Sequence, residues 1–66
     1  MKATINGEER ELPEGTTLSA LLELLRTPRS GIAVARNEQV VGRAHYDSLV
    51  IEEGDSLEII KAVAGG

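Results

Sequence analysis

Cysteine is absent from these 66 residues, and aromatic residues are nearly absent, with Tyr46 as the single example. Without cysteine, the chain has no disulfide, no thiolate ligand for a metal ion and no thiol nucleophile, so any sulfur that it handles must be attached elsewhere. One aromatic ring gives no support for base stacking on nucleic acid. His45 is the only histidine, and without a neighbouring cysteine we expect a surface or turn residue rather than a metal ligand or catalytic base.

Basic residues are also scarce, since seven Lys and Arg stand against eleven Asp and Glu, giving a formal net charge of −4. This balance argues against a nucleic-acid partner, because neutralising phosphates requires a basic surface. No apolar run approaches the length of a membrane-spanning helix, and residues 1–6 lack the apolar centre of a signal peptide. We therefore expect one cytoplasmic domain with no bound cofactor or metal and no membrane partner.

Residues 1–12 predict a β-hairpin. Ala3 and Ile5 alternate with polar residues over positions 2–6, which is the pattern of a half-buried strand. Asn6-Gly7 is a strong signal for a type I′ turn, because that turn requires positive φ at both central residues. A second strand is expected over residues 9–12, with Leu12 facing the core.

A leucine-rich segment predicts one helix over about Thr17–Arg26. Apolar residues recur there at the spacing i, i+3, i+4 and i+7, which places them on one face. They are Leu18, Leu21, Leu22 and Leu25. Leu24 should widen this stripe. Thr16 or Thr17 is suited to cap the start of the helix, and Thr27-Pro28 should end it, because a residue before proline is pushed out of the helical conformation.

The rest of the chain predicts further short strands. Ile32–Arg36 is apolar on both faces, as expected of a central strand, and a turn at 37–39 leads to a short strand at 40–41. Residues 43–48 are irregular, and residues 49–51 return apolar side chains to the core. The last strand is expected over Ser56–Val63. It follows a charged turn that we expect to be solvated, formed by Glu52, Glu53 and Asp55.

These elements predict an α+β domain in which a mixed sheet of about five short strands packs on one helix. One short helix can cover only one face of the sheet, so Ile60 and one of the two residues Val40 and Val41 should remain on the open face. Exposed apolar residues can form a docking patch, although scattered surface apolar residues are common. The candidate docking residues are Ile60, Ala62 and Val41.

The sequence stops on Gly65-Gly66, directly after an apolar, β-prone run. Glycine has no Cβ, so such an end can lie extended in a slot too narrow for other residues. The only chemical group that it then offers is the α-carboxylate of Gly66. We therefore expect a β-sheet domain at 1–63 and a flexible, reactive tail at 64–66. A merely floppy end is the alternative interpretation.

Several short segments together resemble the ThiS family of sulfur carrier proteins, which has the ubiquitin-like β-grasp fold. They are Asn6-Gly7-Glu8, Leu18–Leu22, Val34–Val41, Glu53-Gly54-Asp55 and Val63–Gly66. The Gly-Gly end is shared by ubiquitin-like carriers in general, whereas the segment 37–43 and the Glu-Gly-Asp turn are more specific. Gly42 is a departure, because ThiS-type chains often have proline before the arginine that Arg43 matches.

The resemblance implies a mechanism in which the chain is a co-substrate and not an enzyme. An ATP-dependent adenylating enzyme of the ThiF type would convert the Gly66 carboxylate to an acyl adenylate. A sulfur donor, fed from cysteine by a desulfurase, would turn it into a thiocarboxylate (1-thioglycine). The thiocarboxylate would then deliver sulfur to a ThiG-type thiazole synthase, which builds the thiazole phosphate of thiamine. The partner enzymes would recognise the tail through Ala64, Gly65 and Gly66.

Other functions remain open from the sequence. Carriers of molybdopterin synthesis, the MoaD type, tend to be longer, with phenylalanines and a Pro-Pro before the final glycines. This chain has no phenylalanine, and Lys61-Ala62-Val63 stands in that place. A carrier for tRNA thiolation is a further alternative. A non-covalent ubiquitin-like binding module belongs to a different class, and for it the Gly-Gly end would be incidental.

Overall fold

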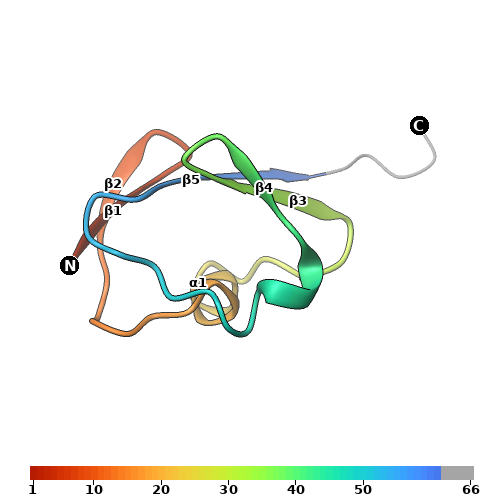
Figure 1. Ribbon diagram of the computed structural model, residues 1–66, viewed down its shortest axis with the longest axis horizontal. Coiled ribbons are helices and arrows are strands. Elements are labelled where there is room, and N and C mark those ends of the chain that lie inside the picture. The colour runs from red at the N-terminus through yellow and green to blue at the C-terminus, as the bar shows by residue number, and fades with distance from the viewer. Residues whose placement is uncertain (62–66) are drawn as a thin grey trace.

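The computed structural model describes residues 1–61 and shows a five-stranded sheet lying over a single helix (Figure 1). The elements follow one another as β1 (Lys2–Ile5), β2 (Glu8–Glu11), α1 (Leu18–Leu24), β3 (Ile32–Arg36), β4 (Gln39–Val41), the 3₁₀ turn η1 (Arg43–His45) and β5 (Ser56–Lys61). The β-grasp arrangement of a mixed sheet on one helix is therefore confirmed.

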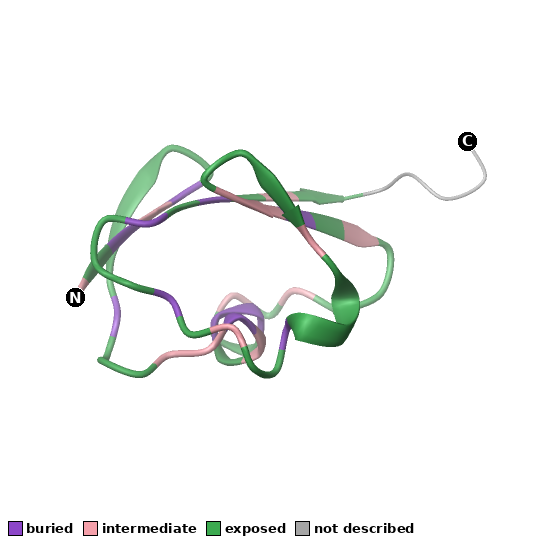
Figure 2. Cartoon of the chain, in the orientation of Figure 1, coloured by how far each residue is buried: buried purple, intermediate pink, exposed green. Residues whose placement is uncertain are grey.

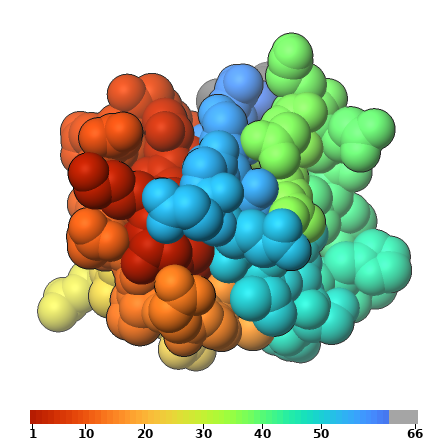
Figure 3. Space-filling view, turned by 60° about the vertical axis from the view of Figure 1, so that its left-hand side comes forward, coloured from red at the N-terminus to blue at the C-terminus, as the bar shows by residue number. Residues whose placement is uncertain are grey.

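The strand order across the sheet is β2-β1-β5-β3-β4. β1 pairs with β5 in parallel, and the other neighbours are antiparallel. β5 consequently occupies the centre, and Figure 3 shows its blue residues between the red N-terminal hairpin and the green β3–β4 hairpin. The expectation that Ile32–Arg36 forms a central strand is confirmed, because β3 is paired on both sides. β3 is an interior strand between β5 and β4, and only one of its two faces meets the helix.

The two hairpin turns use left-handed backbone conformations. Asn6 and Gly7 have φ values of 51° and 81°, so the predicted turn with two positive φ angles is present between β1 and β2. Asn37 and Glu38 repeat the pattern between β3 and β4, with φ values of 49° and 72°. Glu38 therefore holds a conformation that residues with a Cβ rarely adopt.

Helix α1 is shorter than predicted. Thr17 caps its start, because its hydroxyl accepts a hydrogen bond from the backbone N–H of Ala20 at 3.1 Å. The helix ends when Arg26 adopts a φ of 55°, which lets the N–H of Thr27 donate to the carbonyl of Leu22 at 2.9 Å. This is a Schellman-type end, and it comes before Pro28 is reached.

The core lies between the sheet and α1, and Figure 2 shows buried stretches in both of these layers. Leu18, Leu21 and Leu22 are fully buried, as the predicted stripe requires. Leu24 is 59% exposed, so it does not widen the stripe. At 3.6 residues per turn it lies about 120° from Leu18 around the helix axis, which turns it toward solvent.

Tyr46 is a core residue, which the sequence did not predict. The residue is buried, with a relative exposure of 2%, and the guanidinium of Arg29 lies 5.9 Å from the ring centroid. The carbonyl of Tyr46 accepts a hydrogen bond from the N–H of Ser19 at 2.9 Å. The segment after η1 is therefore attached to the start of α1, and it closes one side of the core.

The charged turn before β5 is solvated only in part, because Glu52 and Glu53 are exposed as expected but Asp55 is buried with only 6% exposure. Its carboxylate accepts hydrogen bonds from the backbone N–H of Glu52 at 2.9 Å and from the side-chain amide of Asn37 at 3.2 Å. The Nε of Arg36 also approaches it at 2.9 Å, as an ion pair rather than an aligned hydrogen bond. The partners explain the burial, since a buried charge needs compensating groups.

Candidate functional site

The described part of the candidate site is the end of β5, which carries the chain to within five residues of Gly66. β5 is paired on both sides over its first residues, and its pairing with β3 extends to Ile32↔Lys61. The predicted extension of this strand to Val63 lies outside the described residues. The same is true of the predicted tail residues Ala64, Gly65 and Gly66 and of Ala62.

Two asparagines from the hairpin turns hold the two ends of β5. Asn37 lies at its start, where the side-chain Oδ1 accepts from the N–H of Ser56 at 2.9 Å. Asn6 lies near its end, where the side-chain Oδ1 accepts from the N–H of Ile59 at 2.8 Å. Sequence reasoning identified both residues only as turn formers. Their side-chain contacts join segments 19 and 53 residues apart, so no local pattern could have revealed them.

The open face of the sheet carries an apolar patch, which we call the open-face patch and define as Ala33, Ala35, Val40 and Ile60. Cross-strand partners share a face, and the register pairs Ala33 with Ile60 and Ala35 with Val40. Ile60 is 56% exposed and Val40 is 81% exposed. Ile60 therefore lies where the sequence predicted it, on the side of the sheet away from α1.

The prediction that Val41 belongs to this patch is wrong. Val41 pairs with Val34, which is 1% exposed, and both side chains lie on the core face. Val40 occupies the open face in its place. The sequence could not distinguish the two valines, because a shift of one residue in register exchanges the two faces of a strand.

Acidic residues flank the open-face patch. Because side chains alternate along β5, Glu58 lies on the same face as Ile60. Ser56 shares that face, and it pairs with Thr4, which pairs in turn with Glu9, so Glu9 also lies on the open face. Both glutamates are exposed. The open face thus combines an apolar region over β3, β4 and the end of β5 with a negative region toward β1 and β2.

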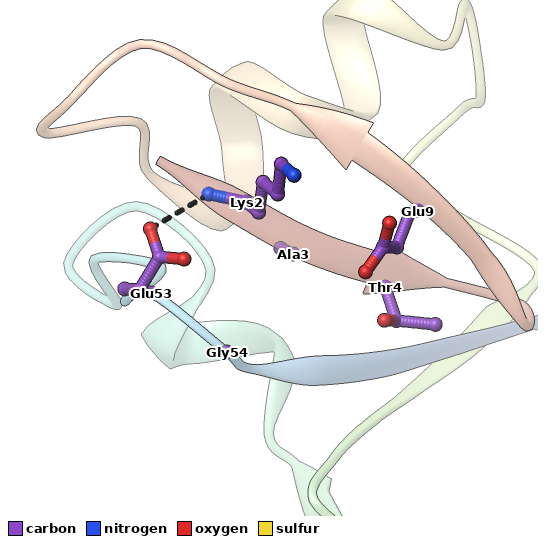
Figure 4. A pocket seen from close by; sticks show the side chains of 6 residues that line it. All are labelled: Lys2, Ala3, Thr4, Glu9, Glu53 and Gly54. Atoms are coloured by element: carbon purple, nitrogen blue, oxygen red, sulfur yellow. Dashed lines mark hydrogen bonds between the residues drawn. The ribbon is translucent and has the colours of Figure 1, made fainter.

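A small cavity of about 110 Å³ lies beside the start of β1 (Figure 4). It is lined by Lys2, Ala3, Thr4, Glu9, Glu53 and Gly54. The backbone N–H of Lys2 donates to Glu53 Oε1 at 2.8 Å across its rim. Gly54 precedes β5, so at about 3.3 Å per residue the cavity lies roughly 20 Å from Lys61. It is therefore remote from the end of β5.

The remaining polar side chains of the described residues do not form a second candidate site. The Ser19 hydroxyl and the Arg29 guanidinium beside Asp47 hold the pKa of that carboxyl below its ordinary value. His45 is exposed in η1, in accord with a surface or turn position. Within residues 1–61, no three His, Cys, Asp or Glu side chains are grouped to hold a metal ion. No helix of that range is long and apolar enough to cross a membrane.

Comparison with known proteins gives a family match over nearly the whole chain, because the profile of the ThiS family matches residues 3–66. The sulfur carrier protein ThiS of Escherichia coli is 30% identical over 66 residues, which cover all of both chains. A thiazole synthase of Paramagnetospirillum magneticum is 39% identical over 66 residues, but the chain spans only 20% of the length of that relative. Another, from Magnetococcus marinus, shows the same identity and coverage.

The fold is also found among solved structures. The crystal structure of a thiamine biosynthesis protein (ThiS) from Geobacter metallireducens superposes with a TM-score of 0.85 at 26% identity, covering 100% of both chains. Fold and relatives together place the chain among small β-grasp proteins that include the named sulfur carriers. The chain belongs to the ThiS family.

Proposed function

We propose that this chain is a sulfur carrier of thiamine biosynthesis whose working group is the α-carboxylate of Gly66. The observation that carries the proposal is the ThiS family match, which continues through Ala64-Gly65-Gly66 to the end of the sequence. The described structure supports it, because the central strand β5 leads directly toward these residues. The reaction requires Gly66 to be the terminal residue when it begins.

The chemistry has two steps on the carrier. A carboxylate oxygen of Gly66 attacks the α-phosphorus of ATP on a ThiF-type enzyme, and pyrophosphate leaves, which gives an acyl adenylate with a good leaving group. A sulfur nucleophile from a donor, charged from cysteine by a desulfurase, then attacks the carbonyl carbon and AMP leaves. If the donor is a persulfide, a further thiol reduces the resulting acyl disulfide to the thiocarboxylate.

The proposed acceptor of the sulfur is a ThiG-type thiazole synthase. Two relatives named thiazole synthase contain a segment similar to this whole chain, which supports a working relation between such a carrier and that enzyme. Glycines at 65 and 66 suit this handover, because a narrow partner channel can exclude water from the hydrolysable intermediate.

The test is the intact mass of the chain after incubation with adenylating enzyme, ATP and a sulfur source. A carrier gains the mass difference between one sulfur and one oxygen, whereas a non-covalent binding module keeps its mass. A variant with one residue added after Gly66 should gain nothing, because the carboxylate is displaced by about 3.3–3.6 Å of extended chain. Gly66→Ala keeps the carboxylate in place and should be impaired less. Sulfur transfer to the extended variant at the parent's rate, without trimming to Gly66, would falsify the proposal.

We further propose that the open-face patch docks the adenylating enzyme. Ile60→Glu should weaken that complex by more than about 1 kcal/mol, as loss of an interface anchor typically does. Leu24→Glu is a matched control, because Leu24 is 59% exposed and Ile60 is 56% exposed, but Leu24 lies on the helix layer. If the two folded variants bind the adenylating enzyme with equal affinity, Ile60 is a scattered surface residue and not a docking residue.

A further inference from the structure

The central strand β5 continues past the end of its neighbour β1. The two strands pair only as far as Ile5↔Leu57, whereas β5 runs on to Lys61 beside β3. Up to that point, every second residue on the β1 side donates a backbone hydrogen bond to the β5 side. The N–H of Thr4 donates to the carbonyl of Asp55, and the N–H of Asn6 donates to the carbonyl of Leu57, each at 2.8 Å.

The next step would place the N–H of residue 8 at the carbonyl of Ile59, but the chain has turned away at Asn6-Gly7. The side-chain amide of Asn6 occupies the place of the missing peptide group. Its Oδ1 accepts from the N–H of Ile59 at 2.8 Å, and its Nδ2 donates to the carbonyl of Ile59 at 3.4 Å. The Asn6 side chain thus bonds both the N–H and the carbonyl of Ile59, as a continuation of β1 would have done.

Asparagine is suited to this position for two reasons. It tolerates the φ of 51° that the turn imposes on residue 6, as few residues with a Cβ do. Its side chain also ends in a donor and an acceptor, the same pair that a peptide group offers. Aspartate would keep the acceptor and lose the donor, whereas glycine would keep the turn and lose both.

We propose that Asn6 is a positioning residue for the carrier reaction. It acts through β5: the β3 pairing holds one side of the strand as far as Lys61, and Asn6 holds the other side at Ile59, seven residues before Gly66 in the sequence. The inference rests on the proposed function at Gly66. Its physical reason is that a reactive group displaced by about 1 Å can react about 100-fold more slowly.

Asn6→Gly is the informative variant, and Asn37→Gly is its matched control. Both asparagines lie in two-residue turns at positive φ, and both accept a hydrogen bond from a β5 N–H. Asn37 holds Ser56 at the start of the strand, so its loss weakens the sheet without releasing the end. Asn6→Asp is a second variant, which keeps the acceptor for Ile59 if glycine impairs folding.

The first measurement is amide hydrogen exchange of the isolated carrier by NMR. In Asn6→Gly, the N–H of Ile59 should exchange about tenfold faster than in the parent, as expected for loss of one hydrogen bond. The N–H of Ile60 points to β3, because successive N–H groups of a strand alternate in direction, and it serves as the internal reference. Unchanged exchange at Ile59 would overturn the proposed contact.

The second measurement is single-turnover adenylation at saturating ATP, with the enzyme in excess over the carrier and varied in concentration so that the maximal rate and the KM are both obtained. We expect Asn6→Gly to react about tenfold more slowly at a KM within about twofold of the parent, because binding is retained and alignment is lost. Asn37→Gly should match the parent. A parent rate in Asn6→Gly, an effect on KM alone, or an equal loss in Asn37→Gly would each overturn the positioning role. Failure of the proposed function itself is distinct, because then the parent chain acquires no adenylate.

Discussion

Replacing Leu22 by alanine should be among the most damaging single changes to this domain. Leu22 is fully buried, at 0% exposure, on the face of α1 that meets the sheet. Truncating a buried leucine removes apolar contacts and leaves a cavity, which together cost about 2–5 kcal/mol. A core of this size supplies roughly 3–5 kcal/mol of net stability. The variant should therefore be largely unfolded at ordinary temperature.

The same helix offers a control for this prediction. Leu24→Ala makes an identical chemical change two residues away, at a side chain that is 59% exposed. We expect it to change the free energy of unfolding by no more than about 0.5 kcal/mol, as is usual for surface positions. Leu22→Met, which roughly conserves volume, should cost less than about 1.5 kcal/mol and remain folded.

The assay is urea unfolding followed by far-UV circular dichroism for the parent and the three variants. The expected order of midpoints is parent close to Leu24→Ala, then Leu22→Met, with Leu22→Ala lowest or without a folded baseline. If Leu22→Ala and Leu24→Ala have the same midpoint, then α1 does not pack through the face described above.

Three further predictions concern turns and charges. Glu38→Gly should raise the free energy of unfolding by about 0.5–1 kcal/mol, because glycine adopts the φ of 72° without strain; a lower urea midpoint would contradict this. Arg26→Gly should raise the thermal midpoint for the same reason at the end of α1, where φ is 55°; an unchanged midpoint would show that the Arg26 side chain offsets its backbone strain. The Ser19 and Arg29 contacts lower the pKa of Asp47 from its usual value of 3.8, so they stabilise the fold above that pH and are lost as pH falls through the lower folded-state pKa. Asp47→Asn should therefore be less stable than the parent at neutral pH, and the difference should vanish in acid; a constant difference at all pH values would refute the assignment.

Local chemistry in the sequence determined much of the fold. Asn6-Gly7 specified a hairpin turn with two positive φ angles, and the start of the helix was predicted at Thr16 or Thr17, of which Thr17 is the cap. The leucine spacing identified which side of α1 is buried, with Leu24 as the exception. These features depend on residues within one or two turns of each other, so a single sequence is sufficient to predict them.

For the candidate site, the sequence predicted the chemical group that would react but not all of the residues around it. From the sequence alone, Gly66 was predicted as the reactive residue, which stays a prediction that the ThiS family match supports. Ile60 was predicted as an exposed apolar residue, and it is 56% exposed. The sequence left the open face to either Val40 or Val41 and named Val41 as the docking candidate, because two adjacent valines in a short strand have no local feature that distinguishes inside from outside. Only the register of β4 on β3 decides between them.

Tertiary structure alone decided the arrangement around β5. The strand order places the last strand between the first and the third, so its partners come from distant parts of the chain. The burial of Asp55 beside Arg36 and the hydrogen bonds of Asn6 to Ile59 follow from that order. An amide and a backbone group 53 residues apart meet only after the sheet has formed, because side-chain periodicity specifies which face a residue takes but not which strand lies beside it.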